Sequence, residues 1–385
     1  MSGLLLFILG VQAMSAQAPG APALWGGLSA GPYGVGWTVV QQVDSSRSLP
    51  GAGRARPVQV VVWYPARSSP SPASARMRVR DYVGLIAGER LTRAAEPGEM
   101  DSAIAALRSV MEANGVDSSA AGRWLSAPVA GERDAPAAQG RFPVVLIAQG
   151  NFHAAYHQAI LAEYLTSHGY IVATTPSPTR ITGPMTSDAD VLPNARDQAA
   201  DLRMALDVAA GRGGQRSRVA VVAHSFGARA ALLFVLEGPG ARGLVSLDGG
   251  IGTATARGWL PTEDTARLGA MRAPVLHFFE TVEPEMKPDF TLLGRLRRTD
   301  RCLVEVRGMR HLHFTSLGPA TGAIEGFAVG PATPDVLIRW RAVARGTLRF
   351  LDRALGSLGT PACPPADSTG GTVRHLPPAG AAGAH

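Results

Sequence analysis

Apolar segments and amphipathic segments alternate along the chain from Phe142 onward. Val144–Ala148 and Val219–Ala223 are uninterrupted apolar runs, as expected of strands that are buried on both faces of a parallel sheet. The predicted strands are Tyr33–Val43, Pro57–Tyr64, Val144–Ala148, Tyr170–Ala173, Val219–Ala223, Leu244–Leu247, Val275–Phe279 and Cys302–Val306, and the predicted helices are Ala154–His168, Ala195–Ala210, Ala228–Leu236 and Pro334–Leu355. This alternation predicts an α/β fold, a doubly wound, mostly parallel sheet with helices on both faces.

The pattern also divides the chain into regions. Residues 31–358 are expected to form one α/β domain. Within it, residues 85–140 show helical spacing broken by Gly, Ala, Ser and Pro, which predicts a helical insertion at the sheet edge or a lid. Residues 19–30 are rich in Ala, Gly and Pro and predict a linker. Residues 359–385 contain few large apolar residues and predict a flexible tail.

The N-terminus and the cysteines both bear on where the protein works. Met1–Ala18 resembles a secretory signal peptide, with an apolar core at Leu4–Leu9 and the small-x-small sequence Ala16-Gln17-Ala18 at its end. This predicts a secreted or periplasmic protein. In an oxidising compartment Cys302 and Cys363 could form a disulfide, but the sequence leaves open whether they pair.

Composition and charge exclude some classes of function. Of the 385 residues, 46% are hydrophobic and 17% are charged, as in globular proteins. The net charge of +7 comes from arginines that are scattered singly, whereas nucleic-acid binders cluster such residues on one face. The sequence contains no phosphate loop, dinucleotide fingerprint or metal-ligand constellation. We therefore expect no nucleic-acid partner, no metal and no cofactor.

The pentapeptide Ala223-His224-Ser225-Phe226-Gly227 carries the clearest chemical signal. It follows an apolar strand and precedes a helical segment. It matches the G-x-S-x-G nucleophile elbow with Ala in the first small position. In such an elbow the serine occupies a strained strand-to-helix turn, so the residues two positions away on either side must be small. Ser225 is therefore the candidate nucleophile, and the elbow predicts an α/β-hydrolase fold.

An acid is expected after the nucleophile in chain order. Asp248 directly follows the predicted strand Leu244–Leu247, and the carboxyl ends of parallel strands are where such sheets build their sites. Glu280 and Glu283, which follow the next predicted strand, are the alternatives.

A histidine base is expected last in the chain order. His311 follows the predicted strand Cys302–Val306, and His313 is the alternative. On an extended segment these two side chains would point to opposite sides, so only one of them would reach Ser225. We favour His311 as the base.

Two backbone N–H groups are expected to form an oxyanion hole. One is the N–H of Phe226, directly after the candidate nucleophile. The other is assigned to Asn151 in the loop Gln149-Gly150-Asn151-Phe152, which follows the strand Val144–Ala148. Gly150 would permit the tight turn of this loop, and Phe152 would line the substrate pocket, so both are candidate substrate-binding residues.

Several motifs together resemble those of a known family. They are Gly31-Pro32-Tyr33-Gly34-Val35-Gly36, Val62-Trp63-Tyr64-Pro65-Ala66, His224-Ser225-Phe226-Gly227, Ser246-Leu247-Asp248 and Arg307-Gly308-Met309-Arg310-His311 with Phe314 after it. They resemble the platelet-activating-factor acetylhydrolase group of α/β-hydrolases, in its bacterial branch near dienelactone-hydrolase-like proteins. The similarity runs from about Gly31 to Leu355, without the insertion.

The resemblance implies a Ca²⁺-independent esterase for short or oxidised acyl esters. It favours Asp248 and His311 over their alternatives. The chain departs from the family at Gln149, where a histidine is usual, at Ala223 of the elbow and throughout the insertion. A cysteine is the nucleophile of true dienelactone hydrolases, so Ser225 argues against that reaction.

The predicted chemistry is acyl transfer through an acyl-enzyme. The expected substrate is a small-molecule or lipid ester, with peripheral contact to lipid as one possibility. The same three side chains would also serve an amide, thioester or polyester hydrolase. A non-catalytic binding protein on the same fold is the alternative from another class, and it would predict a broken triad.

Overall fold

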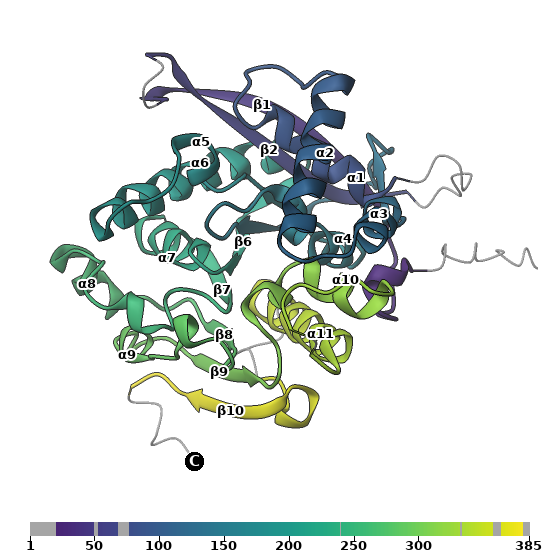
Figure 1. The fold of residues 1–385 in the computed structure, drawn as a ribbon. Coiled ribbons are helices and arrows are strands. Elements are labelled where there is room, and N and C mark those ends of the chain that lie inside the picture. The colour runs from purple at the N-terminus through teal and green to yellow at the C-terminus, as the bar shows by residue number, and fades with distance from the viewer. Residues whose placement is uncertain are drawn as a thin grey trace, which may run out of the picture.

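The structure is a computed structural model, and it describes residues 21–49, 53–67, 77–238, 240–331, 333–356 and 363–379. In this part of the chain, ten strands form one sheet in the order β10-β9-β8-β7-β6-β4-β5-β2-β1-β3 (Figure 1). The strands are β1 (Gly34–Ser48), β2 (Ala55–Ala66), β3 (Gly131–Arg133), β4 (Phe142–Ala148), β5 (Ile171–Thr174), β6 (Gly214–His224), β7 (Ala241–Leu247), β8 (Val275–Phe279), β9 (Arg301–Val306) and β10 (Gly370–Leu376).

The middle of the sheet is parallel, and its two ends are mixed. Strands β5, β4, β6, β7, β8 and β9 run parallel to their neighbours. The long hairpin of β1 and β2 joins them antiparallel through β2 and β5, and β10 pairs antiparallel with β9. The carboxyl ends of the parallel strands therefore lie along one edge, where loops can gather functional side chains.

Helices cover both faces of this sheet. The α-helices are α1 (Val79–Val83), α2 (Pro97–Ala113), α3 (Ser118–Ser126), α4 (Ala159–Ser167), α5 (Thr179–Thr182), α6 (Val191–Gly211), α7 (Gly227–Glu237), α8 (Thr262–Leu268), α9 (Thr291–Gly294), α10 (Leu317–Ala323) and α11 (Val336–Leu355). Helices α6 and α7 lie on one side of the strands, whereas α4, α10 and α11 lie on the other (Figure 1). The predicted mostly parallel α/β architecture is confirmed.

Each face has its own hydrophobic core because the apolar residues of the strands point alternately to the two sides. On β4, Val144 and Leu146 belong to the core beneath α6 and α7, whereas Val145 and Ile147 belong to the core beneath α4 and α11. All four side chains are fully buried. This explains why the run Val144–Ala148 is apolar at every position.

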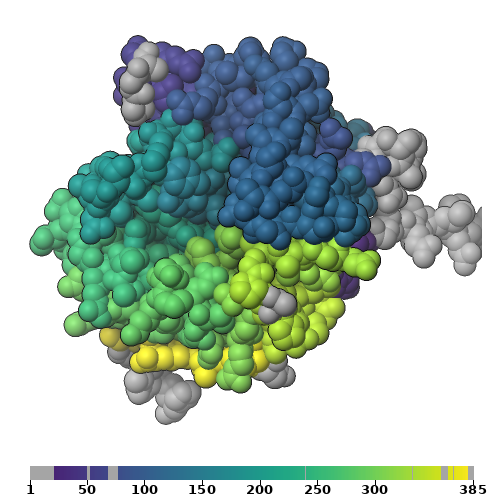
Figure 2. Space-filling model, in the orientation of Figure 1, coloured from purple at the N-terminus to yellow at the C-terminus, as the bar shows by residue number. Residues whose placement is uncertain are grey.

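The insertion is packed into the body of the protein at one end of the sheet. Its strand β3 pairs in parallel with β1, and Trp124 of α3 is buried against Tyr156 and Phe327. In the space-filling view its blue surface continues directly into the yellow-green surface of the C-terminal helices (Figure 2). Residues 85–140 thus contain the helices α2 and α3 together with β3, the edge strand of the sheet.

The described parts of both terminal regions are more ordered than their composition predicts. Leu24, Trp25 and Leu28 are at most 1% exposed, so the predicted linker 19–30 contains core residues. In the predicted flexible tail 359–385, residues Gly370–Leu376 form β10. Both expectations were wrong. The predicted linker is anchored by the buried side chain of Trp25. The predicted tail forms β10 because backbone pairing to β9 does not need an apolar sequence. The predicted signal peptide, residues 1–18, lies outside the described residues.

A disulfide joins Cys302 of β9 to Cys363. It answers the question that the sequence left open. The bond connects the segment that leads into β10 to the strand against which β10 pairs.

Candidate active site

The turn between β6 and α7 has the geometry that the elbow motif predicts. Ser225 lies in this turn with a φ of 55°, a left-handed conformation that side-chain-bearing residues seldom adopt. A Cβ atom on Gly227 would come within 2.3 Å of the carbonyl oxygen of Ala148, so only glycine fits there. The strained turn presents Ser225 at the carboxyl edge of the sheet, as the sequence predicts.

The structure brings Ser225, His311 and Asp248 into one hydrogen-bonded chain. His311 Nε2 lies 2.8 Å from Ser225 Oγ, and His311 Nδ1 lies 2.6 Å from Asp248 Oδ2. The three residues come from the β6–α7 turn, from the segment after β9 and from the end of β7. Because these segments meet only in the folded sheet, residues 86 and 63 positions apart come into contact.

Asp248 is held in place from several directions. Its side chain is 1% exposed, and its φ is 46°. Its backbone N–H donates to the carbonyl of Phe278 at 2.8 Å, and the N–H of Glu280 donates to Asp248 Oδ1 at 3.2 Å. Oδ2 is therefore the oxygen that faces His311.

The two alternative acids do not contact His311. The carboxylate of Glu280 accepts hydrogen bonds from the backbone N–H groups of Val282 and Glu283. Burial raises the pKa of Glu280 to about 7. Glu283 faces Arg310, with 3.8 Å between Oε1 and Nη1. Of the three candidate acids, only Asp248 lies within hydrogen-bonding distance of the histidine.

Only one of the two candidate histidines reaches Ser225, although the segment is not extended. Residues His311–Phe314 form the 3-10 helix η8, so the argument from an extended chain was wrong. His313 is fully buried, and its Nδ1 accepts the N–H of Arg310 at 3.0 Å. Burial lowers the pKa of His313 to about 4, which keeps its ring neutral.

The loop Gly150–Phe152, here called the oxyanion loop, lies against the serine. A Cβ atom on Gly150 would be 3.1 Å from Ser225 Cβ and 2.9 Å from His224 Nδ1, so this position also requires glycine. Among the described residues, the backbone N–H groups of Asn151 and Phe226 donate to no partner. Both predicted oxyanion donors are thus unengaged beside Ser225.

Phe152, the last residue of the oxyanion loop, has a strained backbone conformation and an exposed side chain. Its φ is 58° and its side chain is 43% exposed. Its N–H donates to Thr179 Oγ1 at 2.9 Å, and its carbonyl accepts from Arg180 Nη1 at 3.1 Å. The sequence gives no signal for Thr179 or Arg180, because both lie in the short helix α5, which has no motif of its own.

Three further histidines lie behind His311 in a row of rings. The ring centroids are 3.9 Å apart for His157 and His153, 5.0 Å for His153 and His224, and 4.6 Å for His224 and His311. His224 Nε2 donates to the carbonyl of His311 at 3.0 Å. Burial lowers the pKa of all three hidden rings, that of His157 to about 3. The row is therefore neutral and places no positive charge beside His311.

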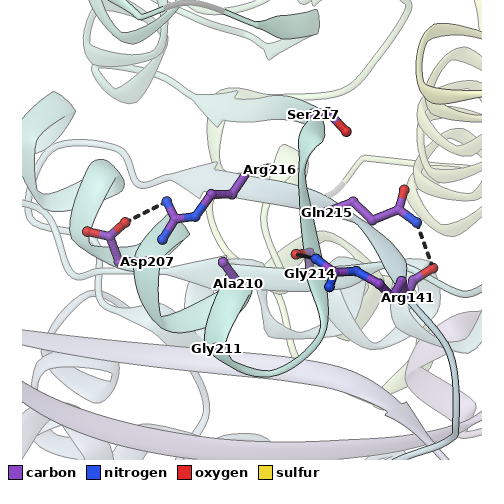
Figure 3. A pocket seen from close by; sticks show the side chains of 8 residues that line it. All are labelled: Arg141, Asp207, Ala210, Gly211, Gly214, Gln215, Arg216 and Ser217. Atoms are coloured by element: carbon purple, nitrogen blue, oxygen red, sulfur yellow. Dashed lines mark hydrogen bonds and ion pairs between the residues drawn. The ribbon is translucent and has the colours of Figure 1, made fainter.

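Other features of the described residues lie apart from this cluster. A surface hollow of about 810 Å³ lies where β4 and β6 begin, at the opposite end of these strands from Ser225 (Figure 3). Of its three charged residues, Arg216 and Asp207 form an ion pair at 2.6 Å, and Arg141 is the third. No group of three or more His, Cys, Asp or Glu side chains in the described ranges is arranged to hold a metal. None of the helices described is both long and apolar enough to cross a membrane.

Comparison with known proteins adds one similarity. No family model and no curated protein sequence matches the chain. A solved structure, a ferulic acid esterase from Streptomyces cinnamoneus, is similar with a TM-score of 0.59 and 19% sequence identity, over 91% of this chain and 98% of that chain. At this identity the similarity concerns the fold and not the substrate. The comparison gives no specific support for the platelet-activating-factor acetylhydrolase group, but it agrees with the sheet and the elbow that the chain has an α/β-hydrolase fold.

Proposed function

We propose that the protein is a serine hydrolase that cleaves carboxylic esters through an acyl-enzyme. The observation that carries this proposal is the chain of contacts from Asp248 Oδ2 through His311 to Ser225 Oγ, with distances of 2.6 and 2.8 Å. Nucleophile, base and orienting acid in this order are the parts that acyl transfer requires. An unbroken triad argues against a non-catalytic binding protein.

Each residue has a defined role in the proposed reaction, and His311 acts in turn as base and as acid. His311 Nε2 takes the proton of Ser225 as Oγ attacks the ester carbonyl, and Asp248 holds the imidazole in the matching orientation and stabilises its charged form. The backbone N–H groups of Phe226 and Asn151 donate hydrogen bonds to the carbonyl oxygen and stabilise the negative charge that develops on it. His311 then protonates the leaving alcohol, and a water activated by the same ring releases the acyl group.

The surroundings of Ser225 favour an ester with an apolar part. Phe152 and Val282 are two of the exposed large apolar side chains, at 43% and 41%. Phe152 belongs to the oxyanion loop, and Val282 lies two residues after Glu280, whose backbone N–H donates to Asp248 Oδ1. We propose short-acyl or lipid esters as substrates, as the resemblance to platelet-activating-factor acetylhydrolases implies, with apolar contact at the mouth of the site. Thioesters, amides and polyesters are the alternative acyl donors.

The test is hydrolysis of p-nitrophenyl esters from acetate to decanoate, with methyl ferulate as an aromatic ester. Wild type is compared with Ser225→Ala and with Ser217→Ala, an exposed serine at the far end of β6. We expect Ser225→Ala to lose at least about a thousandfold in kcat and Ser217→Ala to match wild type. A fluorophosphonate should label Ser225 alone, as mass spectrometry of peptides would show. If Ser225→Ala keeps wild-type turnover, the proposal is wrong.

We also propose that the protein works outside the cytosol. The disulfide between Cys302 and Cys363 supports an oxidising compartment, and the predicted signal peptide agrees with it. The intact mass of protein recovered from an exporting host should correspond to a chain that starts after Ala18, with two hydrogens missing from the cysteines. A chain that retains residues 1–18 inside the cytosol would contradict this.

A further inference from the structure

We propose that Arg180, held by Glu89 of the insertion, is a positioning residue that fixes the oxyanion loop by binding the carbonyl of Phe152. These three groups are here called the brace. The inference rests on the proposed function, because it assigns a catalytic purpose to the shape of the oxyanion loop. It gives the insertion a role in catalysis through its contact with this loop.

The brace is a chain of two contacts between three separate segments. Arg180 Nη1 donates to the carbonyl of Phe152 at 3.1 Å, and Arg180 Nε donates to the carboxylate of Glu89 in a close ion pair. Arg180 belongs to α5, in the loop after β5, and Glu89 follows the 3-10 helix η3 (Gly84–Gly88) of the insertion. Arg90 makes a second link between the same segments, from Nη1 to the carbonyl of Ile181 at 2.7 Å.

The conformation of Phe152 explains why such a brace is needed. A side-chain-bearing residue at a φ of 58° is strained, and this conformation persists only where neighbours hold it. Both polar groups of its backbone are held, the N–H by Thr179 and the carbonyl by Arg180. Thr179 Oγ1 also donates to Asn151 Oδ1 at 2.8 Å. The loop that carries the Asn151 N–H is thus fixed by one short segment, Thr179–Arg180.

The ion pair between Glu89 and Arg180 is largely buried, and its geometry requires an arginine. The side chain of Glu89 is 3% exposed, whereas that of Arg180 is 21% exposed. Burial raises the pKa of Glu89 to about 7, and the guanidinium of Arg180 counteracts this rise. Arginine also presents Nε and Nη1 in one rigid plane, which matches its two acceptors in the brace, whereas lysine is a single point charge. Arg180→Lys should therefore keep the charge but only part of the positioning.

The experiment compares Glu89→Gln, Arg180→Ala and Arg180→Lys with wild type on p-nitrophenyl acetate. For Glu89→Gln and Arg180→Ala we expect kcat to fall about 10- to 100-fold, as when an oxyanion donor is misplaced, with KM within about twofold. Arg180→Lys should recover part of the loss. Glu112→Gln is the matched control, because it alters an exposed ion pair in the same insertion, between Glu112 and Arg108, and it should keep wild-type kcat.

A second readout does not depend on turnover. Hydrogen exchange of the backbone amides in residues 150–153 should accelerate at least about tenfold in Glu89→Gln and Arg180→Ala, but not in Glu112→Gln. If the wild type proves inert towards esters, the proposed function fails, and this exchange experiment still decides whether the brace fixes the loop. Wild-type kcat together with unchanged exchange in the folded Glu89→Gln variant would overturn the brace. If Glu89→Gln lowers the melting temperature but leaves kcat unchanged, the ion pair is merely structural, and the proposed role of the brace is also wrong.

Discussion

Two buried carboxylates, Asp248 and Glu163, have opposite kinds of surroundings. Glu163 of α4 accepts four hydrogen bonds from neutral donors, which are Trp25 Nε1, Tyr82 Oη and the backbone N–H groups of Ala130 and Gly131, at 2.7 to 3.2 Å. This group, here called the Glu163 hub, joins the N-terminal segment, α1 and the insertion to α4. The Glu163 hub is structural, because all four donors find their acceptor inside the protein and hold these segments together.

In contrast to the Glu163 hub, the site around Asp248 combines strained backbone conformations with backbone donors that have no acceptor in the described part of the chain. Asp248, Ser225 and Phe152 all have positive φ angles without being glycine. The N–H groups of Asn151 and Phe226 lack an acceptor among the described residues. Strain and unused donors lower stability, and a fold retains them where they serve a reaction. The comparison therefore predicts that mutations at the first site change rate more than stability, and that mutations at the hub do the reverse.

The largest expected effect is that of Asp248→Asn. An amide cannot hold His311 in the productive orientation with the same charge, so kcat/KM for p-nitrophenyl acetate should fall about 10⁴-fold. The melting temperature should change by only a few degrees. Asp289→Asn is the control, since Asp289 pairs with Arg257 at the surface, and it should keep wild-type turnover. A loss of less than tenfold in Asp248→Asn would remove Asp248 from the triad.

Glu163→Ala should have the next largest effect, and it should act on stability. Removing the carboxylate leaves three buried donors and the half-buried N–H of Ala130 without an acceptor, which should lower the free energy of unfolding by about 3–5 kcal/mol. Urea denaturation measures this value, and kcat per folded molecule should stay near wild type. Glu237→Ala removes a surface ion pair with Arg203 and should cost at most about 1 kcal/mol. A mild loss in Glu163→Ala would contradict the role of the hub.

Glu280, which lies beside Asp248, should make the stability of the protein depend on pH. Its pKa is raised from 4.5 to about 7, so the folded state binds its proton more tightly than the unfolded state does. The stability from this group is therefore present below about pH 4.5 and is lost as pH rises towards 7. Wild type should lose on the order of 1 kcal/mol between pH 5 and pH 8, after allowance for solvent screening. Glu280→Gln should lack this loss, and identical pH slopes in urea titrations would refute the assignment.

The smallest expected effect is that of Phe152→Gly on stability. Glycine adopts a positive φ without strain, so the free energy of unfolding should rise or stay within about 1 kcal/mol of wild type, although an apolar side chain is lost. Because the oxyanion loop becomes looser, kcat should fall about tenfold. Such a trade of activity for stability is expected at the proposed catalytic site and not at the Glu163 hub. If both quantities fall together, Phe152 stabilises the fold in the ordinary way.

The sequence was most informative where signals are local. Apolar runs such as Val144–Ala148 locate buried strands, because a strand covered on both faces has no polar position. The elbow around Ser225 is a five-residue unit whose steric needs are visible as small residues. The order of the remaining candidates along the chain then led to Asp248 and His311, which the structure brings together with Ser225.

The failures all involve contacts between residues far apart in the chain. Trp25 anchors the predicted linker to Glu163, 138 positions away, and Arg180 meets Glu89 across 91 positions. Neither pair leaves a periodic pattern. β10 was missed because its pairing with β9 uses backbone groups, which every sequence has. The 3-10 helix His311–Phe314 is a local exception, because its short bonds, such as the N–H of His313 to the carbonyl of Arg310, leave no periodic pattern in so few residues.

The strand β10 has one more consequence, which concerns contact between molecules. Without it, β9 would present unpaired N–H and C=O groups along the margin of the sheet, a template on which a second copy could add a strand. The disulfide at Cys302 and a hydrogen bond from Arg301 Nη2 to the carbonyl of Pro377 at 2.9 Å both hold the covering segment in place. In an oxidising environment the disulfide helps to keep this margin paired, and its reduction would remove one of the links that hold β10 over β9.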